Sequence, residues 1–216
     1  MKTAVVIVCF NPCDSFFDDN FNIANAVYII VDNTVMPQAD FIARLTDFKD
    51  VIYLPQYNNT GIAKALNIGC QKALDLGYEF VITMDQDSYI GTEQVSQLIS
   101  YFILYEYDVK MAIVSPLHIL KNGVLSSKDF DSNNAVVNSI FTMTSGNLLC
   151  LKAWRDIGKF NSDLFIDLVD TDFYVRAMLK GYHVFTLRNV RMRHNLGNLE
   201  VKSFLNKKIY IYNHSY

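Results

Sequence analysis

The sharpest chemical feature of the sequence is a pair of carboxylates separated by one residue. Asp85 and Asp87 follow directly on the apolar run Phe80–Met84, which predicts a buried strand. Unpaired acids at a strand end repel each other, and a divalent cation relieves that repulsion. The simpler alternative is two solvated acids in a turn, with Asp87 capping the next helix. Because the pair leaves a buried strand, we favour a site for Mg²⁺ or Mn²⁺ that would also neutralise a diphosphate.

A second group of acids surrounds the start of a predicted helix over Val169–Lys180. Asp172 and Arg176 are spaced as an i,i+4 ion pair, which is a structural role. Asp167 and Asp170 lie near the helix start, where acids interact favourably with the helix dipole. One of them could instead be a general base that faces a substrate hydroxyl. The residues alone leave both roles open.

Two further segments carry groups suited to an anionic ligand. Asn59–Gly69 opens a predicted helix, and helix N-termini bind phosphate through free N–H groups. Thr60 as an ordinary N-cap is a compatible alternative. His194 lies beside Arg191 and Arg193, which indicates a basic rim, although a lone histidine is more often structural.

Short apolar runs alternate with helical patterns in the first half of the chain. The predicted strands are Ala4–Phe10, Ala26–Val31, Val51–Leu54 and Phe80–Met84, and the predicted helices are Pro37–Phe48, Thr60–Leu76 and Gly91–Tyr105. This alternation predicts βαβ units and an α/β fold with a mainly parallel sheet. Ligands of such sheets bind beyond the carboxyl ends of the strands. Asn11, Asp32, Asn33 and the Asp85–Asp87 turn are therefore the polar groups of interest.

The second half has a less regular pattern. Met111–Ser115 and His183–Thr186 predict strands, whereas the polar stretch Leu117–Ile140 remains unassigned. No repeat or Gly/Ser linker divides the chain, so we expect one domain over residues 1–216. The run Ile209–Tyr212 is apolar and β-prone, and we expect it to pack back on the domain as a strand or short helix.

Composition excludes several classes of protein. Of the 216 residues, 51% are apolar and 19% charged, which excludes disorder and allows a sizeable core. The formal net charge of −3 provides no basic footprint for nucleic acid. The four cysteines show no paired zinc spacing, and we find neither a signal peptide nor a membrane-spanning run. We expect a reducing, cytoplasmic location, with peripheral attachment to the inner face of the cell membrane as a variant.

Seven segments, taken together, resemble the inverting family 2 glycosyltransferases of GT-A fold, and most closely their rhamnosyltransferase-like bacterial branch. They occur in the order of that branch: Val8–Pro12, Val31–Asn33, Asn59–Gly69, Met84–Ser88, Thr144–Asn147, Phe165–Asp170 and His194–Gly197. The resemblance implies a Rossmann-like, mainly parallel sheet flanked by helices, with a small additional mixed sheet in the second half. It also implies a nucleotide-sugar-binding half over residues 1–105 and an acceptor-side half over residues 106–216. Family members usually continue past Tyr216, so we expect a C-terminally truncated chain, with a minimal enzyme as the alternative.

The resemblance assigns a role to individual residues. Asp170 matches the family's catalytic base, with Asp167 as a second candidate because Val169 replaces the usual glutamate. Asp87 would be the principal metal ligand, helped by Asp85 and His194. The residues implied in donor binding are Cys9, Asn11, Pro12, Asp32, Asn59, Gly61, Asn67, Asp85 and Gln86.

The function implied is metal-dependent, inverting sugar transfer onto a polysaccharide or lipid-linked glycan. The expected donor is dTDP-L-rhamnose, with a UDP-sugar as the alternative. A haloacid-dehalogenase-like phosphohydrolase also carries Asp-x-Asp after an apolar strand, but usually on its first strand, whereas three strands precede Asp85 here. A donor-binding but inactive partner subunit is the non-enzymatic alternative.

Overall fold

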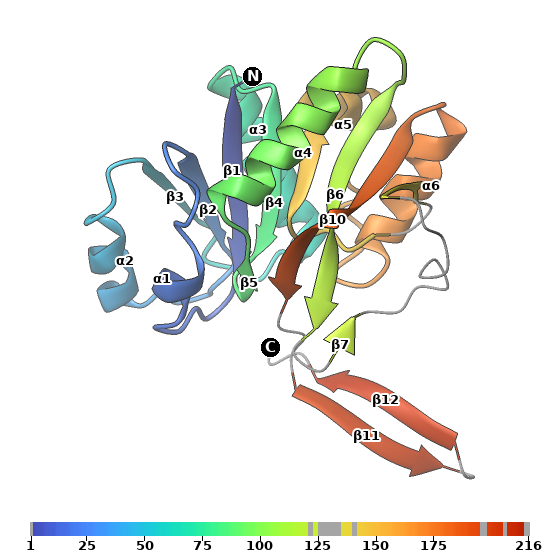
Figure 1. The fold of residues 1–216 in the computed structure, drawn as a ribbon. Coiled ribbons are helices and arrows are strands. Elements are labelled where there is room, and N and C mark those ends of the chain that lie inside the picture. Colours follow the sequence, from blue (N-terminus) through green and yellow to red (C-terminus); the bar gives the residue numbers. More distant parts are fainter. Residues whose placement is uncertain are drawn as a thin grey trace.

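A ten-stranded mixed sheet organises the computed structural model, which describes residues 2–120, 123–124, 135–139, 142–194, 198–204 and 207–213 (Figure 1). The strand order is β3-β2-β1-β4-β9-β6-β10-β5, with β7 on β6 and β8 on β10. The strands of this sheet are β1 (Thr3–Cys9), β2 (Val27–Asp32), β3 (Val51–Pro55), β4 (Phe80–Asp85), β5 (Ser88–Tyr89), β6 (Met111–Leu120), β7 (Gly123–Val124), β8 (Val136–Asn138), β9 (Asn147–Cys150) and β10 (His183–His194). The helices are α1 (Phe16–Asp19), α2 (Ala39–Leu45), α3 (Ile62–Asp75), α4 (Thr92–Tyr105), α5 (Leu151–Ile157) and α6 (Val169–Leu179).

The first half of the chain forms the predicted parallel part of the sheet. β1 pairs in parallel with β2 and β4, and β2 pairs in parallel with β3. The predicted strands and helices of this half are confirmed within a few residues. Two details differ: α3 begins at Ile62, with Gly61 and not Thr60 as its N-cap, and Pro37 precedes α2 instead of occupying its first position.

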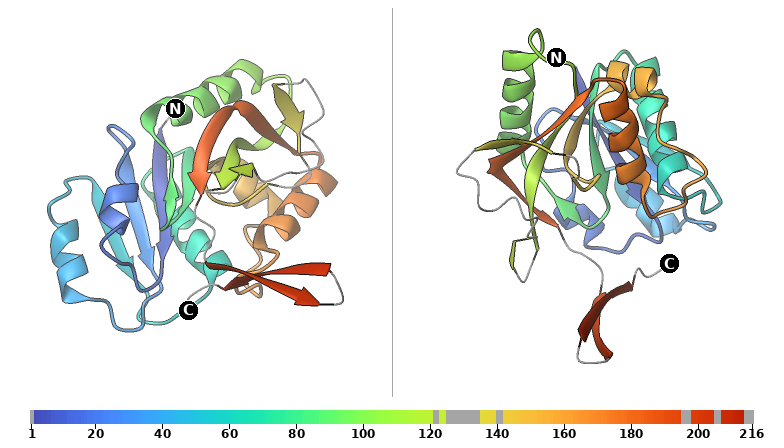
Figure 2. Two further views of the ribbon diagram at one scale, coloured as in Figure 1. Left: turned by 60° about the horizontal axis from the view of Figure 1, so that its bottom comes forward. Right: turned by 90° about the vertical axis from the view of Figure 1, so that its right-hand side faces the viewer.

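Helices cover both faces of the sheet (Figure 2). Successive strand residues point to opposite faces, and in β1 both sets are apolar, so both faces need a cover of helices. Ala4 and Val6 of β1 belong to a core cluster built with α3, α5 and α6. Val5 and Ile7 belong to a second cluster built with α1, α2 and α4. This double burial explains the uninterrupted apolar run that begins the chain.

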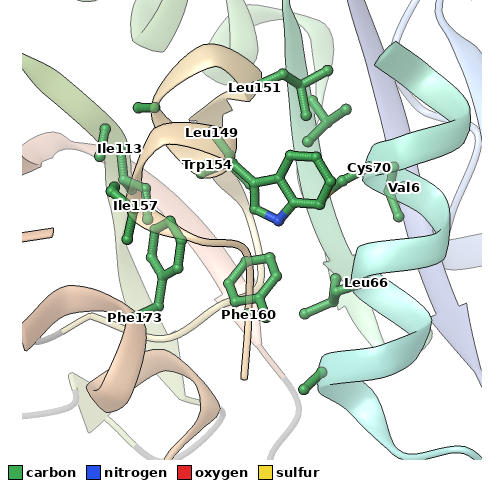
Figure 3. Packing of buried hydrophobic residues seen from close by; sticks show 14 of the residues in the cluster. Val6, Leu66, Cys70, Ile113, Leu149, Leu151, Trp154, Ile157, Phe160 and Phe173 are labelled. Atoms are coloured by element: carbon green, nitrogen blue, oxygen red, sulfur yellow. The ribbon is translucent and has the colours of Figure 1, made fainter. Parts of the chain in front are cut away.

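Trp154 fixes the position of α5 against α3 (Figure 3). Its side chain is fully buried and packs in the cluster that contains Leu66, Cys70 and Phe160. Its indole Nε1 donates a hydrogen bond of 3.1 Å to Asn67 Oδ1 on α3. The sequence analysis did not predict helix α5.

The second half extends the same sheet. β9 lies antiparallel between β4 and β6, while β6 and β10 pair in parallel. Most of Leu117–Ile140 lies outside the described residues, apart from the end of β6, β7 and β8. Among the described residues, no helix is long and apolar enough to cross a membrane.

A separate two-stranded antiparallel sheet follows β10. It consists of β11 (Asn198–Phe204) and β12 (Lys207–Asn213), and it lies apart from the large sheet in Figures 1 and 2. Ile209–Tyr212 is therefore a strand, one of the two predicted forms, but the structure does not show the expected packing of this run on the domain. It pairs with β11, however, and does not join the large sheet, because the chain turns back at once into a hairpin.

Candidate active site

Parallel pairing brings the polar strand ends to one edge of the sheet, the lower edge in Figure 1. The register places Cys9 beside Asp32 and Val8 beside Asp85. Helix α6 begins at the same edge, because it runs antiparallel to the β10 strand that follows it (Figure 1). The carboxyl ends of β1, β2 and β4 and the start of α6 thus surround one region.

Three carboxylates gather in this region from two distant parts of the chain. Asp85 is partly buried at the end of β4. Burial, followed by the negative charges of Asp87 and Asp170, raises the pKa of Asp85 to about 7. Asp170 is therefore within electrostatic reach of the Asp85–Asp87 turn, although more than eighty residues separate them in sequence. The structure thus brings these acids into one region, and their assignment to one functional site remains a prediction.

Asp170 lies in the first turn of α6. Its Oδ1 accepts a hydrogen bond of 2.7 Å from the backbone N–H of Thr171. Burial raises its pKa above the ordinary value, and the neighbouring charge of Asp167 adds to this effect. Asp167 is exposed, whereas Asp170 is partly buried. Asp172 forms the predicted ion pair with Arg176, at 2.6 Å, and so has a structural partner of its own.

The carboxylates of this region suit a hard divalent cation, since such cations prefer oxygen ligands and Mg²⁺ commonly binds one or two carboxylates together with substrate phosphates. The observation that supports the fit is the raised pKa of Asp85, which comes first from burial and then from the negative charges of Asp87 and Asp170. No cluster of three His, Cys, Asp or Glu side chains is arranged as a finished metal site among the described residues. Asp85 and Asp87 would therefore hold only part of the coordination shell, and donor phosphate oxygens would complete it.

His194 ends β10, where its backbone pairs with Ser88, the residue after Asp87. The fold thus brings His194 next to the Asp85–Asp87 turn. Its side chain and the following residues Asn195–Gly197 lie outside what the structure describes.

Asp32, predicted to bind the donor, is fully buried in a hydrogen-bonded network. Its Oδ1 accepts from the backbone N–H of Thr34 at 2.9 Å, and its Oδ2 accepts from the Tyr53 hydroxyl at 2.7 Å. The Cys9 thiol also bonds to it, and burial together with this carboxylate raises the pKa of Cys9. The network joins the ends of β1, β2 and β3 beneath the surface of the site.

The segment after β1 is held against the Asp85–Asp87 turn. Gln86 Oε1 accepts a 2.9 Å bond from the backbone N–H of Phe10. Asn11 is exposed and has a φ of 45°, a left-handed conformation that is uncommon outside glycine. Its backbone N–H donates to Thr34 Oγ1 at 2.8 Å, and Pro12 next to it is buried. Asn11 is thus exposed beside a buried proline in this segment.

The start of α3 contacts the segment that leads to α6. The backbone N–H of Ile62 donates a 2.6 Å bond to the carbonyl of Phe165. Gly61 has a φ of +81°, and a Cβ there would lie 2.5 Å from the same carbonyl oxygen, so only glycine fits. The Gly61 N–H donates to Asn59 Oδ1 at 3.2 Å. The first N–H of the helix is therefore already bonded to the Phe165 carbonyl and is not available to phosphate. A phosphate at this helix start would have to bind neighbouring groups.

Asn67 lies farther along α3 and is engaged on both sides of its amide. Its Oδ1 accepts from Trp154 Nε1 and from the Phe160 N–H, at 3.1 and 3.0 Å. Its Nδ2 donates to the Phe160 carbonyl and to Ser162 Oγ, at 2.8 and 3.1 Å. These bonds give Asn67 a role in joining α3 to the segment before α6, and its predicted contact with the donor remains a prediction.

Two buried residues support the Asp85–Asp87 turn, and the sequence did not predict that role for either. Ser145 Oγ accepts from the Asp85 N–H at 3.0 Å, and His118 Nε2 lies 2.6 Å from the Ser145 carbonyl. The only sequence signal for Ser145 is its place in a segment of the family pattern. His118 has no partner visible in the sequence, because its contact lies twenty-seven residues away.

The large mixed sheet with helices on both faces has the GT-A fold of glycosyltransferases. The structure superimposes on TarS of S. aureus solved in complex with UDP-GlcNAc, with a TM-score of 0.70 and 18% identity over 93% of this chain and 60% of that one. It also superimposes on GalNAc-T7 solved with UDP, GalNAc and Mn²⁺, with a TM-score of 0.70 and 13% identity over 90% of this chain and 44% of that one. The expected GT-A fold is confirmed.

Sequence comparison relates the chain to a family of glycosyltransferases. Residues 23–129 match the model of Glycosyl transferase family 2. The dTDP-rhamnosyl transferase RfbF of Shigella flexneri is 29% identical over 190 residues, which cover 82% of this chain and 62% of that protein. Just under half of the chain thus matches glycosyltransferase family 2, and this match together with the rhamnosyl transferase relative supports a glycosyltransferase. The chain spans less than two thirds of the length of each of these three relatives. Family and fold together favour a glycosyltransferase over the phosphohydrolase alternative.

Proposed function

We propose that this chain is an inverting glycosyltransferase that moves L-rhamnose from dTDP-L-rhamnose onto a glycan acceptor. The observation that carries the proposal is that the charges of Asp87 and Asp170 both act on the partly buried carboxyl of Asp85 at the carboxyl edge of the sheet. One group can hold the diphosphate side of a donor while the other faces an incoming hydroxyl. The similarity to a dTDP-rhamnosyl transferase supports the choice of sugar. A UDP-sugar is the alternative donor, because the structural relatives were solved with UDP or UDP-GlcNAc.

Asp170 is the proposed general base. Its raised pKa strengthens it as a proton acceptor relative to an ordinary aspartate, and its partial burial limits competition from water. It would take the proton of the acceptor hydroxyl as that oxygen attacks the anomeric carbon from the face opposite the diphosphate. One direct displacement of this kind inverts the anomeric configuration. Asp167, which is exposed and adjacent, is the second candidate.

Asp87, with Asp85 and His194, would hold Mg²⁺ or Mn²⁺. Such a cation, when bound, supplies the positive charge that stabilises the departing nucleoside diphosphate. The protein groups then have two tasks: Asp85 and Asp87 orient the diphosphate, and Asp170 removes the proton. The solved complex of GalNAc-T7 with Mn²⁺ supports a divalent metal in this fold.

The donor nucleoside would lie along the ends of β1, β2 and α3. In the predicted donor-binding set Asn11 is exposed, and Asn59, Asn67 and Gln86 are partly exposed. Cys9, Pro12 and Asp32 are buried and would shape the pocket from beneath, while Gln86 holds the β1 tip through Phe10. The acceptor is a polysaccharide or a lipid-linked glycan, which would bring the protein to the inner face of the cell membrane.

Donor turnover with defined nucleotide sugars tests the proposal. The protein is incubated with Mn²⁺ and either dTDP-L-rhamnose or UDP-GlcNAc, with and without a rhamnose-accepting glycan, and nucleoside diphosphate release is measured. Release from dTDP-L-rhamnose that rises with acceptor, and a product of inverted anomeric configuration by NMR, are expected. Nucleotide binding without turnover of any acceptor would instead indicate the inactive partner subunit, and phosphate release from simple phosphomonoesters would indicate a phosphohydrolase.

A further inference from the structure

Strand β9 stops two residues short of the Asp85–Asp87 turn. Its antiparallel register with β4 runs from Phe80 opposite Cys150 to Thr83 opposite Asn147. Continued by two residues, the same register would place Ser145 opposite Asp85. The chain leaves the ladder at Gly146, whose φ is +78° and whose Cβ, if present, would lie 2.0 Å from Met192 Sδ.

Beyond the end of the backbone pairing, the side chain of Ser145 forms the next hydrogen bond to β4. Its Oγ accepts the Asp85 N–H at 3.0 Å, a position that a backbone carbonyl would occupy in a continued sheet. Two shorter bonds hold the same segment to β4: Thr83 Oγ1 to the Thr144 carbonyl, and the Gly146 N–H to the Thr83 carbonyl, each 2.6 Å. Ser145 is only 1% exposed, so its hydroxyl is shielded from bulk water.

His118 holds Ser145 from the other side. This residue is on β6, is 6% exposed, and places Nε2 2.6 Å from the Ser145 carbonyl. Because a carbonyl only accepts, Nε2 carries the proton and donates. Burial lowers the pKa of His118 to about 4, so the ring is neutral at pH 7 and brings no positive charge toward the carboxylates.

We propose that Ser145, fixed by His118, is a positioning residue that aims the Asp85–Asp87 turn at the cation and donor diphosphate. This role rests on the proposed function, since it presupposes that the turn binds a metal. The hydroxyl fixes the backbone of Asp85 and thereby the direction in which both carboxylates leave the strand. In this role both residues act through the backbone of Asp85 and not on the substrates directly.

Metal binding measured separately from activity tests this role. Mn²⁺ affinity is determined by EPR titration in the presence of dTDP for the unmodified protein, Ser145→Ala and Ser145→Thr. Partners beyond the metal ligands typically change metal affinity by about 10–100-fold when removed, so Ser145→Ala should weaken Mn²⁺ binding by that factor. Ser145→Thr, which keeps the hydroxyl, should stay near the original value.

The matched control is Ser115→Ala. Ser115 is equally buried on β6, but its hydroxyl bonds to Thr142 Oγ1 and the Pro116 carbonyl instead of the turn. It should lower the melting temperature without changing Mn²⁺ affinity, which separates positioning from general stability. If Ser145→Ala does not fold, the Mn²⁺ affinities of His118→Gln and His118→Leu are compared instead. Only glutamine can donate a hydrogen bond to the Ser145 carbonyl, so His118→Gln should bind Mn²⁺ more tightly than His118→Leu.

The outcomes separate the positioning role from the proposed function. A folded Ser145→Ala protein that binds Mn²⁺ within twofold of the original would overturn the positioning role and leave the proposed function standing. Equal Mn²⁺ affinity of the two His118 variants would overturn it as well. An unmodified protein that binds dTDP but no Mn²⁺ would overturn the metal-dependent function, and the role of Ser145 with it.

Discussion

The backbone N–H of Ile62 and the carbonyl of Phe165 form a 2.6 Å hydrogen bond between the two halves of the chain. Ile62 is the first residue of α3, on the proposed donor side, and Phe165 precedes the helix that carries Asp170. A second link is the Asn33 Nδ2 bond to the Gly61 carbonyl, at 3.1 Å, which ties the same helix start to the end of β2. These two hydrogen bonds connect the segment before the proposed base to the donor side, so a change at one end should alter the other.

Gly61→Ala should disturb this junction. The new Cβ would lie 2.5 Å from the Phe165 carbonyl oxygen, and the φ of +81° disfavours any side chain. We expect a loss of about 1–3 kcal/mol in the free energy of unfolding from the strained backbone, and more from the clash. Gly77→Ala is the matched control, with a φ of +79° and nothing within 4 Å of its Cβ. Urea unfolding of both variants measures the difference; equal losses would mean that the contact with Phe165 contributes nothing.

Asp87→Ala should abolish metal-dependent nucleotide binding and leave the fold intact. Removing one of two neighbouring acids relieves repulsion and costs little packing, since the side chain is only partly buried. Isothermal titration of dTDP with and without Mn²⁺ measures the effect, with Asp108→Ala, in an exposed turn after α4, as the control. An unchanged Mn²⁺-dependent affinity would remove Asp87 from the site.

Asp170→Asn should leave donor binding nearly unchanged and lower transfer by about 10²–10⁴-fold, the usual contribution of a general base. The amide keeps the shape of the side chain but cannot accept the proton. Asp167→Asn, on an exposed neighbour, should have a much smaller effect. The rate of sugar transfer to the acceptor is measured for both variants at saturating donor. A larger loss of rate in Asp167→Asn than in Asp170→Asn would make Asp167 the base.

The stability of the metal-free protein should fall as the pH rises toward 8. The folded-state pKa of Asp85, about 7, lies above its ordinary value of 3.8, so the folded protein binds this proton more tightly than the unfolded chain. The stabilisation is therefore complete below about pH 4 and is lost as the pH passes through the folded-state pKa. A pKa difference of one between the folded and unfolded chain corresponds to about 1.4 kcal/mol in the free energy of unfolding. Because Asp85 is partly exposed, solvent screening reduces this contribution.

Thermal unfolding at pH 5 and pH 8 measures this dependence, with Asp85→Asn for comparison. The asparagine variant should show a flatter profile, with a residual slope in the same direction from the raised pKa of Asp170. Added Mn²⁺ should restore stability at pH 8 in the original protein only. An identical pH profile in the two proteins would contradict the raised pKa.

Asn67→Ala should reduce stability more than nucleotide affinity. Its side chain makes four hydrogen bonds, and the variant leaves Trp154 Nε1 and the Phe160 N–H without their acceptor. Each unsatisfied buried group costs about 1–3 kcal/mol. Chemical unfolding and dTDP titration together measure the two effects. A large loss of affinity with unchanged stability would instead identify Asn67 as a donor-binding residue.

The sequence by itself determined the parallel part of the fold and the identity of its acids. The apolar runs that end in Asp32 and Asp85 specify buried strands, because a strand covered on both faces needs apolar side chains at every position. Asp170 was recognised through its place in a family pattern, and its nearness to Asp85 follows once strand ends and helix start share one edge.

Only the tertiary structure decided which side chains support that site. The bonds from His118 to Ser145 and from Ser145 to Asp85 join β6, the segment before β9 and β4. No local pattern predicts them, because β9 enters the sheet antiparallel between β4 and β6 and the register ends at Gly146. Hydrogen bonds between residues distant in sequence depend on that register, and a shift of one residue would turn Ser145 to the opposite face.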